Sequence, residues 1–547
     1  SGVFDMKLRT GNSDVREYTF QTGLMGIDFA TEGPIGSLEN ASYLVNYRYS
    51  TLGLLTKLKV VDTEQLPIYQ DLSFKLNFPT RSAGTLSLWG IGSVDELSEF
   101  EEPDSTLWET DWDRLKFDSR FNTRAMGLNH KKLIGKSTFI NSTIATITED
   151  IIYDHDRLDD ALLLRDEEYI DNFNGKTTLT STINHKFSSR FSNQTGITWN
   201  YLFYDMTMKS TVESEPESYQ TFVEEKGNTQ LLQAFTQFEY SPVRSIKLNT
   251  GIHYEYFMLN DNFSLEPRLG VRWNIHPNHT VSFGYGKHSQ LEKLQYYLAR
   301  REVSMSTVYP NKYLNFTHAD HYVLGYDFQL TPNTRIKIEP YYQNLYDVPV
   351  KENGSFSFVN LKNEFYINDQ LFNKGTGKNI GVDLTVERFL SDDYYYLVTA
   401  SLFDSKYTGG DGIERDTRYN RNYVINVLGG KEFHVRESNI LGVNGRFTYM
   451  GGERTAPVFL HESMLQRRVI LDESLAFTES LAGNQYLDIS VTYRINKRNS
   501  AHVFALQVKN ILGSPNDYGY AYNFSTEQIE RDQTVIMLPS ISYKIEF

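Results

Sequence analysis

Apolar and polar residues alternate with a period of two in many segments of this chain. The clearest case is the C-terminus, where every second residue is apolar: Ile541, Tyr543, Ile545 and Phe547. The same alternation recurs in residues 71–78, 322–328, 380–387 and 487–495. Successive side chains of a β-strand point to opposite faces, so a period of two predicts strands. One face of each strand is apolar and the other carries charge, which predicts an all-β fold.

The composition separates two classes of membrane protein. A membrane-spanning helix needs roughly 20 consecutive apolar residues, and the longest apolar runs, such as residues 535–538, stop after a few. The mean hydropathy of -0.46 suits a soluble protein, but a barrel with alternating faces has the same average. The 37 Tyr and 34 Phe residues favour the barrel, because aromatic girdles mark its two interfaces. Periodicity alone leaves a soluble β-sandwich open.

Turns and loops alternate along the chain, and this favours a transmembrane β-barrel. Short turns are predicted at residues 36–40, 79–84, 130–136, 188–190, 242–245, 276–278, 332–333, 391–393, 435–438 and 496–499. The connections between them are mostly longer and polar, as expected for short periplasmic turns and long extracellular loops. Ten turns join twenty strands in pairs, and segments 17–24 and 538–547 add one strand each. We therefore expect about 22 strands, with residues 23–26 forming a tight loop or a bulge.

Charge and cysteine content exclude other functions. The formal net charge of -15 argues against nucleic-acid binding, which needs a basic surface. The chain has no cysteine, so it has neither disulfides nor a thiolate metal site. This also suits a chain that crosses an oxidising compartment.

Several motifs resemble one family of outer-membrane barrels. Residues 264–270 (Ser-Leu-Glu-Pro-Arg-Leu-Gly) with residues 282–286 resemble the central hairpin of TonB-dependent outer-membrane receptors. Residues 508–512 resemble the family's penultimate-strand motif, and the terminal Phe547 matches the end of many such barrels. Residues 321–327, 373–379 and 401–407 are similar to the Bacteroidetes type of this family.

The resemblance also implies a domain organisation. Residues 1–9 look like the last strand of the plug domain that fills such barrels. We therefore expect residues 1–12 to be a plug remnant and residues 13–547 to be the transmembrane barrel. Family members normally carry the whole plug, preceded by a segment that contacts TonB, because barrels of this size are plugged.

The function implied by the resemblance is TonB-dependent active import of a nutrient across the bacterial outer membrane. Siderophores, glycans, peptides and cobalamin all lie within the family's range. Expected partners are outer-membrane lipids, the TonB system through the missing N-terminal region, and a surface lipoprotein lid or other outer-membrane proteins. The alternative is a receptor-like barrel that serves as a structural subunit of a larger outer-membrane complex without transport.

Catalytic motifs are incomplete, and no cofactor or enzymatic activity is expected. Residues 461–465 begin like a zinc-protease motif, but Leu465 stands where the second His is needed. Residues 375–379 resemble part of a phosphate loop, but Asn379 replaces Ser or Thr and a strand is expected to follow. A triad formed only in space is not excluded by motif.

Acidic and aromatic residues gather in segments that we expect to be loops. The acidic segments are residues 96–104, 150–168 and 213–225; a solvated surface is the simpler interpretation, and Ca²⁺ binding is the alternative hypothesis. The aromatic residues Trp108, Trp112, Tyr153 and Tyr169 either stack on a ligand or pack loops together. The sequence identifies no substrate-binding residue, and the metal sites are unknown.

Overall fold

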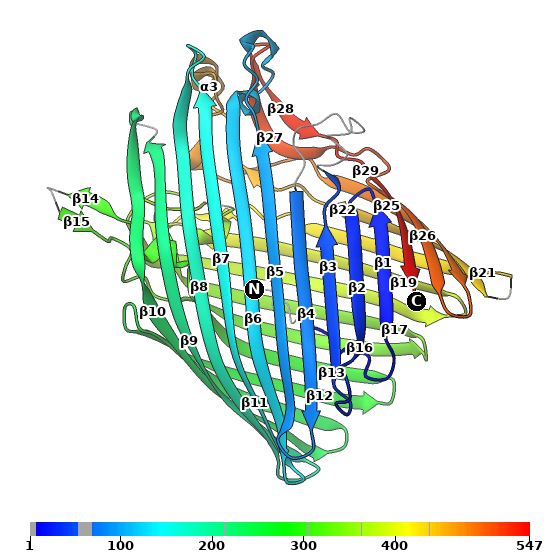
Figure 1. The fold of residues 1–547 in the computed structure, drawn as a ribbon. Coiled ribbons are helices and arrows are strands. Elements are labelled where there is room, and N and C mark those ends of the chain that lie inside the picture. Colours follow the sequence, from blue (N-terminus) through cyan, green and yellow to red (C-terminus); the bar gives the residue numbers. More distant parts are fainter. Residues whose placement is uncertain (1–6, 53–67, 213–214, 304–305, 363, 437) are drawn as a thin grey trace.

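The chain forms a closed antiparallel β-barrel in the computed structural model, which describes residues 7–52, 68–212, 215–303, 306–362, 364–436 and 438–547 (Figure 1). Its 22 strands are β1 (Glu17–Gly23), β2 (Gly26–Pro34), β3 (Ser42–Tyr49), β4 (Ile68–Thr80), β5 (Gly84–Glu99), β6 (Leu115–Ile134), β7 (Thr138–Leu158), β8 (Leu164–Lys186), β9 (Phe191–Val212), β10 (Glu215–Val243), β11 (Ile246–Phe257), β12 (Asn262–His276), β13 (His279–Gln290), β16 (Thr317–Thr331), β17 (Thr334–Lys351), β18 (Leu371–Ser391), β19 (Tyr394–Thr408), β21 (Tyr423–Val435), β22 (Asn439–Met450), β25 (Asn484–Asn496), β26 (Ala501–Lys509) and β29 (Leu538–Glu546). Each pairs with the next, and β1 pairs with β29. The predicted fold and strand number are confirmed.

All ten predicted short turns join strands at the same end of the barrel. Residue 437, within one of these turns, lies outside the described residues. The start of β1 and the C-terminal residue also meet at this end, since the amide of Phe547 donates to the carbonyl of Tyr18. Residues 23–26 form a tight hairpin in which Gly23 pairs with Gly26, so this segment is a loop and not a bulge. The long connections lie at the opposite end, which is therefore extracellular.

Smaller elements lie within the long connections. They are the hairpins β14 (Arg301–Val303) with β15 (Ser306–Val308), β23 (Arg454–Thr455) with β24 (Glu479–Ser480) and β27 (Asn516–Asn523) with β28 (Gln528–Thr534), the short strand β20 (Glu414–Asp416), the helices α2 (Leu294–Tyr297) and α3 (Leu460–Gln466), and the 3-10 turns η1 (Ser105–Leu107), η2 (Asp111–Arg114), η3 (Phe358–Asn360) and η4 (Glu473–Leu475). Among the described residues, no helix has the length and apolar character needed to cross a membrane.

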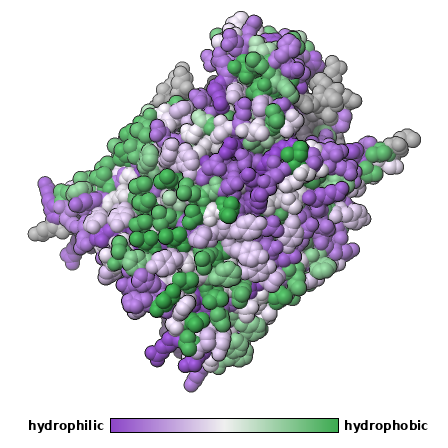
Figure 2. Space-filling model, turned by 180° about the vertical axis from the view of Figure 1, so that it is seen from behind, coloured by the Kyte–Doolittle hydropathy of each residue, from purple (hydrophilic) through white to green (hydrophobic). Residues whose placement is uncertain are grey.

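The two faces of the barrel wall differ in polarity. On β16, Tyr322 and Leu324 lie on the outer face and are well exposed, whereas His321 and Asp327 lie on the inner face. Figure 2 shows large hydrophobic areas on the outer wall. An apolar outside and a polar inside are the arrangement that a bilayer requires of a spanning barrel.

The barrel rim is much taller on one side. Strands β8, β9 and β10 have 23, 22 and 29 residues, whereas β1 and β3 have 7 and 8. About 9–11 residues cross the hydrocarbon core, so the tall strands continue above the membrane (Figure 1). The prediction that residues 150–156 lie in a loop is therefore wrong, because they lie on β7. Residues 96–99 likewise lie on β5, and 166–168 on β8. Above the membrane the outer face of a strand contacts water instead of lipid, which removes the apolar outer face that identifies a spanning strand.

The N-terminal segment lies inside the barrel. The guanidinium of Arg9 pairs with the carboxylate of Glu32 on β2, which is 6% exposed. The amide of Asn12 donates to the same carboxylate at 2.8 Å, and the Lys75 Nζ donates to the carbonyl of Leu8 at 2.8 Å. Residues 7–12 have no regular secondary structure, and residues 1–6 lie outside the described residues, so the plug-strand assignment stays a prediction.

A substitution at Gly11 is expected to release this segment from the wall. A Cβ atom at Gly11 would lie 2.1 Å from the carbonyl oxygen of Tyr43, so Gly11→Ala forces the backbone apart. We expect faster proteolysis after Arg9 in detergent-solubilised protein. The matched control is Gly284→Ala, because a Cβ there has nothing within 4 Å. Equal cleavage of the two variants would contradict the observed contact.

Candidate functional site

Two extracellular loops fold inward and pack against the tall side of the barrel. The connections β13–β16 (residues 291–316) and β17–β18 (residues 352–370) contribute most of one apolar cluster. Its buried members are Phe257, Tyr296, Tyr297, Leu314, Phe316, Ile367 and Leu371. Each fully buried side chain of this size contributes about 1.5–3 kcal/mol. The loops therefore form a folded layer over the mouth of the barrel.

A second apolar cluster attaches the same loops to the inner face of β8 to β10. It consists of Ile170, Tyr204, Met206, Met208, Val223 and Leu298, with Tyr153, Leu294, Phe365 and Tyr366 packed against it. The rings of Phe222 and Tyr366 stack with centroids 4.5 Å apart. The extra height of these strands thus provides the surface on which the loops are built.

Glu292 lies at the base of this layer, in the β13–β16 loop. The Thr317 hydroxyl donates to its carboxylate at 2.8 Å, and burial raises its pKa to about 7. The same burial raises the pKa of Tyr296 to about 12. A carboxyl group that titrates near neutral pH therefore lies within the packed loop structure.

A cavity of about 590 Å³ opens among four extracellular connections. Its walls come from residues within 351–362 and from Glu364 at and after the end of β17, from Arg418 before β21, from residues within 453–481 after β22, and from Tyr518 on β27. Ligand sites are commonly concave and about 300–1,000 Å³ in volume. The cavity therefore has the size of a small-molecule site, and it lies where an external solute first meets the protein.

Two buried polar side chains in the cavity wall lack hydrogen-bond partners. Ser357 and Asn360 are 2% and 6% exposed, and neither the Ser357 Oγ nor the Asn360 Nδ2 has a hydrogen-bond partner in the part of the chain that the structure describes. The other end of the Asn360 amide is engaged, because its Oδ1 accepts from the amide of Arg418 at 2.9 Å. An unpaired buried donor costs about 1–3 kcal/mol, so this part of the cavity wall is held together at a cost to local stability.

Arg418 is positioned by a turn in the β19–β21 connection that side-chain hydrogen bonds stabilise. Asn420, which is 1% exposed, donates from its side chain to Asp404 at 2.8 Å and to Asp416 at 3.0 Å. The Arg418 guanidinium lies 5.7 Å from the ring centroid of Phe477. No carboxylate of the described residues lies within ion-pair distance of that guanidinium. It is therefore a positioned cation at the cavity wall.

Phe477 adopts a strained backbone conformation in the same wall. Its φ of 62° is rare for a bulky residue and costs of order 1–3 kcal/mol. Its ring packs edge-on against Tyr407 at 5.9 Å, and the Tyr407 hydroxyl donates to the carbonyl of Ser355 at 2.7 Å. The surrounding contacts thus fix an aromatic face at the cavity, at a cost to local stability.

A second depression of about 650 Å³ lies on the inner wall of β16 to β19. It is lined by polar side chains such as Glu339, Gln343 and Asp383, and by Tyr419. Because Tyr419 follows Arg418 directly, one turn borders both the loop cavity and this depression. The two spaces are therefore neighbours at this turn.

Two buried carboxylates also lie together on the inner wall near the mouth. Glu255 and Glu266 are 5% and 2% exposed, and the Ser289 hydroxyl, which has one proton to donate, lies within hydrogen-bond distance of both carboxylates. Arg268 donates to Glu266 at 2.7 Å. His253 also contacts Glu266, with its Nδ1 3.1 Å from the carboxylate, so the two carboxylates belong to a buried polar network of the wall.

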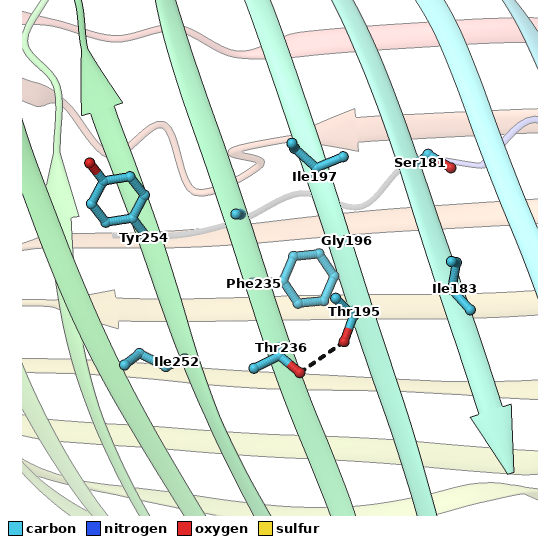
Figure 3. A pocket seen from close by; sticks show the side chains of 10 residues that line it. Ser181, Ile183, Thr195, Gly196, Ile197, Phe235, Thr236, Ile252 and Tyr254 are labelled. Carbon is cyan, nitrogen blue, oxygen red and sulfur yellow. Dashed lines mark hydrogen bonds between the residues drawn. The ribbon is translucent and has the colours of Figure 1, made fainter.

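A third depression belongs to the membrane-facing surface (Figure 3). It has a volume of about 470 Å³ and spans β8 to β11. Ile183, Ile197 and Tyr254 are exposed and surround smaller side chains, and the pairing of Thr195 with Thr236 places these groups on one face. The Phe235 ring lies on the other face, against Gly196. This depression is apolar and faces lipid, so it is not a solute site.

The aromatic residues considered from the sequence serve different roles. Trp108 is buried and packs edge-on against Phe524, and its Nε1 donates to the carbonyl of Glu102 at 2.7 Å. Tyr153 lies on β7 and stacks on Phe365 of the inward loop at 6.0 Å. Both pack loops together. Tyr169 lies on β8, and Trp112 is 59% exposed.

The incomplete zinc-protease and phosphate-loop motifs lie in a long loop and in a strand, as expected from the sequence. Residues 461–465 belong to α3 in an extracellular loop, and residues 375–379 lie on β18 and not at a helix N-terminus. Among the described residues, no three His, Asp or Glu side chains converge on a metal position. The side chains of residues 213–218 lie outside the described part. The geometry therefore adds no support to the Ca²⁺ hypothesis.

Sequence reasoning did not identify the residues of the loop cavity. Ser357, Asn360 and Arg418 lie in connections without motif or periodicity, and only folding brings them together. Glu266 lies within residues 264–270, the segment that resembles the family's central hairpin, so a search for charged residues within family motifs would have found it.

The comparisons with known proteins agree with this architecture. The family described as TonB dependent receptor-like, beta-barrel matches residues 26–511. No curated protein matches the chain. The ferric yersiniabactin uptake receptor FyuA from Yersinia pestis has a TM-score of 0.68 at 11% identity, and the match covers 98% of this chain and 81% of FyuA. BauA, the ferric preacinetobactin receptor from Acinetobacter baumannii, has a TM-score of 0.67 at 10% identity, covering 98% and 80%.

Proposed function

The chain belongs to the TonB-dependent receptor β-barrel family of the outer membrane, and from that premise we propose that it imports a small polar nutrient with energy delivered through TonB. Family members are receptors and transporters and not enzymes. The observation that carries the proposal is the cavity of about 590 Å³ among the extracellular loops. A polar depression on the inner wall lies beside the turn that lines this cavity, and it supports the same proposal.

Several finer features belong to the same proposal. A plug domain that precedes residue 1 fills the lumen. Its chain continues into residues 7–12, which lie against the barrel wall. TonB acts on a segment that precedes this plug. A surface lipoprotein covers the loops in the manner expected of Bacteroidetes-type receptors. The ferric siderophore receptors among the similar structures make an iron chelate one candidate ligand.

The mass of the protein purified from its native outer membrane tests this arrangement. An import receptor is expected to have an intact mass well above the 63.3 kDa of this chain, because the plug is part of the same polypeptide. A mass near 63.3 kDa, with other outer-membrane proteins in fixed stoichiometry, would instead support the structural-subunit alternative.

A further inference from the structure

The barrel closes between β1 and β29 on its short side, where the strands do not cover the apolar layer of the membrane. These two strands have 7 and 9 residues. A strand of 7 residues, tilted as in other barrels, covers roughly 16–19 Å along the membrane normal, against an apolar band of about 25 Å. Figure 1 shows the extracellular ends of β1 and β2 far below those of β7 and β8. Residues outside these strands therefore complete the band, at one of its two ends.

The periplasmic end of this closure already lies at the membrane surface. The rings of Tyr18 and Phe547 stack with centroids 5.5 Å apart, in the manner of the aromatic girdles that mark a membrane interface. The charged residues Arg16 and Glu17 come just before Tyr18, and both are exposed. Charged side chains are costly in hydrocarbon, so the band does not extend past Tyr18 in this direction. Its missing part lies at the extracellular end.

Three irregular segments at the extracellular end of the closure form an apolar surface, which we call the rim patch. They are the turn between β1 and β2, the turn after β26 and the segment before β29. The side chains of the rim patch, each 37–52% exposed, are Leu24, Met25, Ile511, Leu512, Val535, Ile536 and Met537. No charged residue occurs within residues 22–27, 510–516 or 533–543. The last two segments are joined, because the Asn510 Nδ2 donates to the carbonyl of Ile536 at 3.1 Å.

The backbone of the rim patch has the hydrogen bonds that contact with lipid demands. A carbonyl group in the apolar layer has no water to bond, so it needs a donor from the protein. The carbonyl of Leu24 accepts from the Thr51 hydroxyl at 3.1 Å. The carbonyl of Met25 accepts from the Tyr69 hydroxyl at 2.8 Å. The amide of Leu24 donates to the carbonyl of Ile541 on β29 at 3.2 Å. Irregular backbone at this position is therefore compatible with hydrocarbon.

We propose that the rim patch inserts into the outer leaflet of the membrane and contacts lipid acyl chains. The short strands leave part of the apolar band uncovered, and the charged periplasmic end assigns that part to the extracellular rim. The satisfied carbonyls allow turns to lie at that depth. The bilayer then covers the rim at the β1–β29 closure, whereas the tall strands on the other side stand in water. The proposal does not depend on import, because it needs only the barrel and a bilayer.

Fluorescence quenching in lipid vesicles tests the depth of the rim patch. The chain has no cysteine, so single-cysteine variants of the full-length protein take one environment-sensitive fluorophore each. The test variants are Met25→Cys and Leu512→Cys. Leu324→Cys is the lipid control, since Leu324 lies on the outer face of β16, and Leu465→Cys is the water control, since Leu465 is 71% exposed in an extracellular loop. The vesicles are phosphatidylcholine, with either a nitroxide on the acyl chains or iodide in the water.

The two quenchers give opposite results for lipid and for water. At Met25 and Leu512 we expect nitroxide quenching similar to that at Leu324, and at least roughly threefold stronger than at Leu465, with iodide showing the reverse order. Stronger quenching by iodide than by nitroxide would place the rim patch in water. Protection from both quenchers would show that protein covers it. Either result would overturn the proposal.

The Thr51 hydroxyl provides a second test that needs no label. Thr51→Val removes the donor to the carbonyl of Leu24, and in hydrocarbon no water replaces it. We expect the equilibrium constant for folding into phosphatidylcholine vesicles to fall at least roughly fivefold. Thr478→Val is the matched control, because the Thr478 hydroxyl donates to the carbonyl of Leu475 at 2.8 Å in an exposed loop, where water takes over. An equal effect of the two substitutions would contradict insertion of the rim patch.

Discussion

The Leu324→Arg variant is expected to lose about 2–4 kcal/mol of folding stability in a lipid bilayer. Leu324 is 50% exposed on the outer face of β16, near the middle of a strand of 15 residues. A guanidinium at that depth would have to leave water for hydrocarbon, where no described side chain compensates it. Urea titrations of folding into lipid vesicles measure the loss.

Val323→Arg is the matched control, because Val323 is the neighbouring residue and faces the lumen. The inner wall is polar, and Glu339 lines the same depression, so little change in stability is expected. Equal destabilisation by the two substitutions would contradict the assignment of the outer and inner faces.

The packing of the β13–β16 loop is expected to weaken as the pH rises toward 7. The folded-state pKa of Glu292 is about 7, against an ordinary value of 4.5, so the folded loop retains a proton that the opened loop loses. Protonated Glu292 stabilises the folded loop fully below pH 4.5. Between pH 4.5 and 7 this stabilisation falls by about 1.4 kcal/mol per pH unit, so the total loss is about 3 kcal/mol. Hydrogen exchange of the Leu298 and Arg300 amides, corrected for intrinsic rates, should show opening roughly 100-fold easier at pH 8 than at pH 4.5.

Glu292→Gln removes the titrating group and keeps an acceptor for the Thr317 hydroxyl. The corrected exchange in this variant is expected to be independent of pH over the same range. If the unmodified protein also showed no pH dependence, or if the variant kept it, Glu292 would not be the responsible group.

The barrel itself was predictable from the sequence because lipid imposes a strict pattern. Residues 322–328 alternate because one face contacts hydrocarbon and the other the lumen, and short turns such as residues 332–333 leave little conformational choice. The same reasoning was wrong for residues 150–156. There β7 continues above the membrane, its outer face contacts water instead of lipid, and its acidic residues give the strand the composition of a loop.

The loop cavity was not predictable for a related physical reason. Its polar residues come from separate connections, and nothing in the local sequence distinguishes Asn360 from any other loop asparagine. What distinguishes Asn360 is its burial in the folded protein, because a polar side chain that packing removes from water needs a hydrogen-bond partner. The left-handed backbone conformation of Phe477 could not be predicted from the sequence either, since contacts with Tyr407 and its neighbours impose it.

Solute depletion by cells tests the import function most directly. Cells with the full-length protein in their outer membrane, with and without functional TonB, would be incubated in a medium of mixed small polar solutes and iron chelates. Mass spectrometry would then follow which compounds disappear. Import predicts depletion of at least one solute only when the protein and TonB are both present. Equal depletion without TonB, or no protein-dependent depletion of any solute, would contradict it.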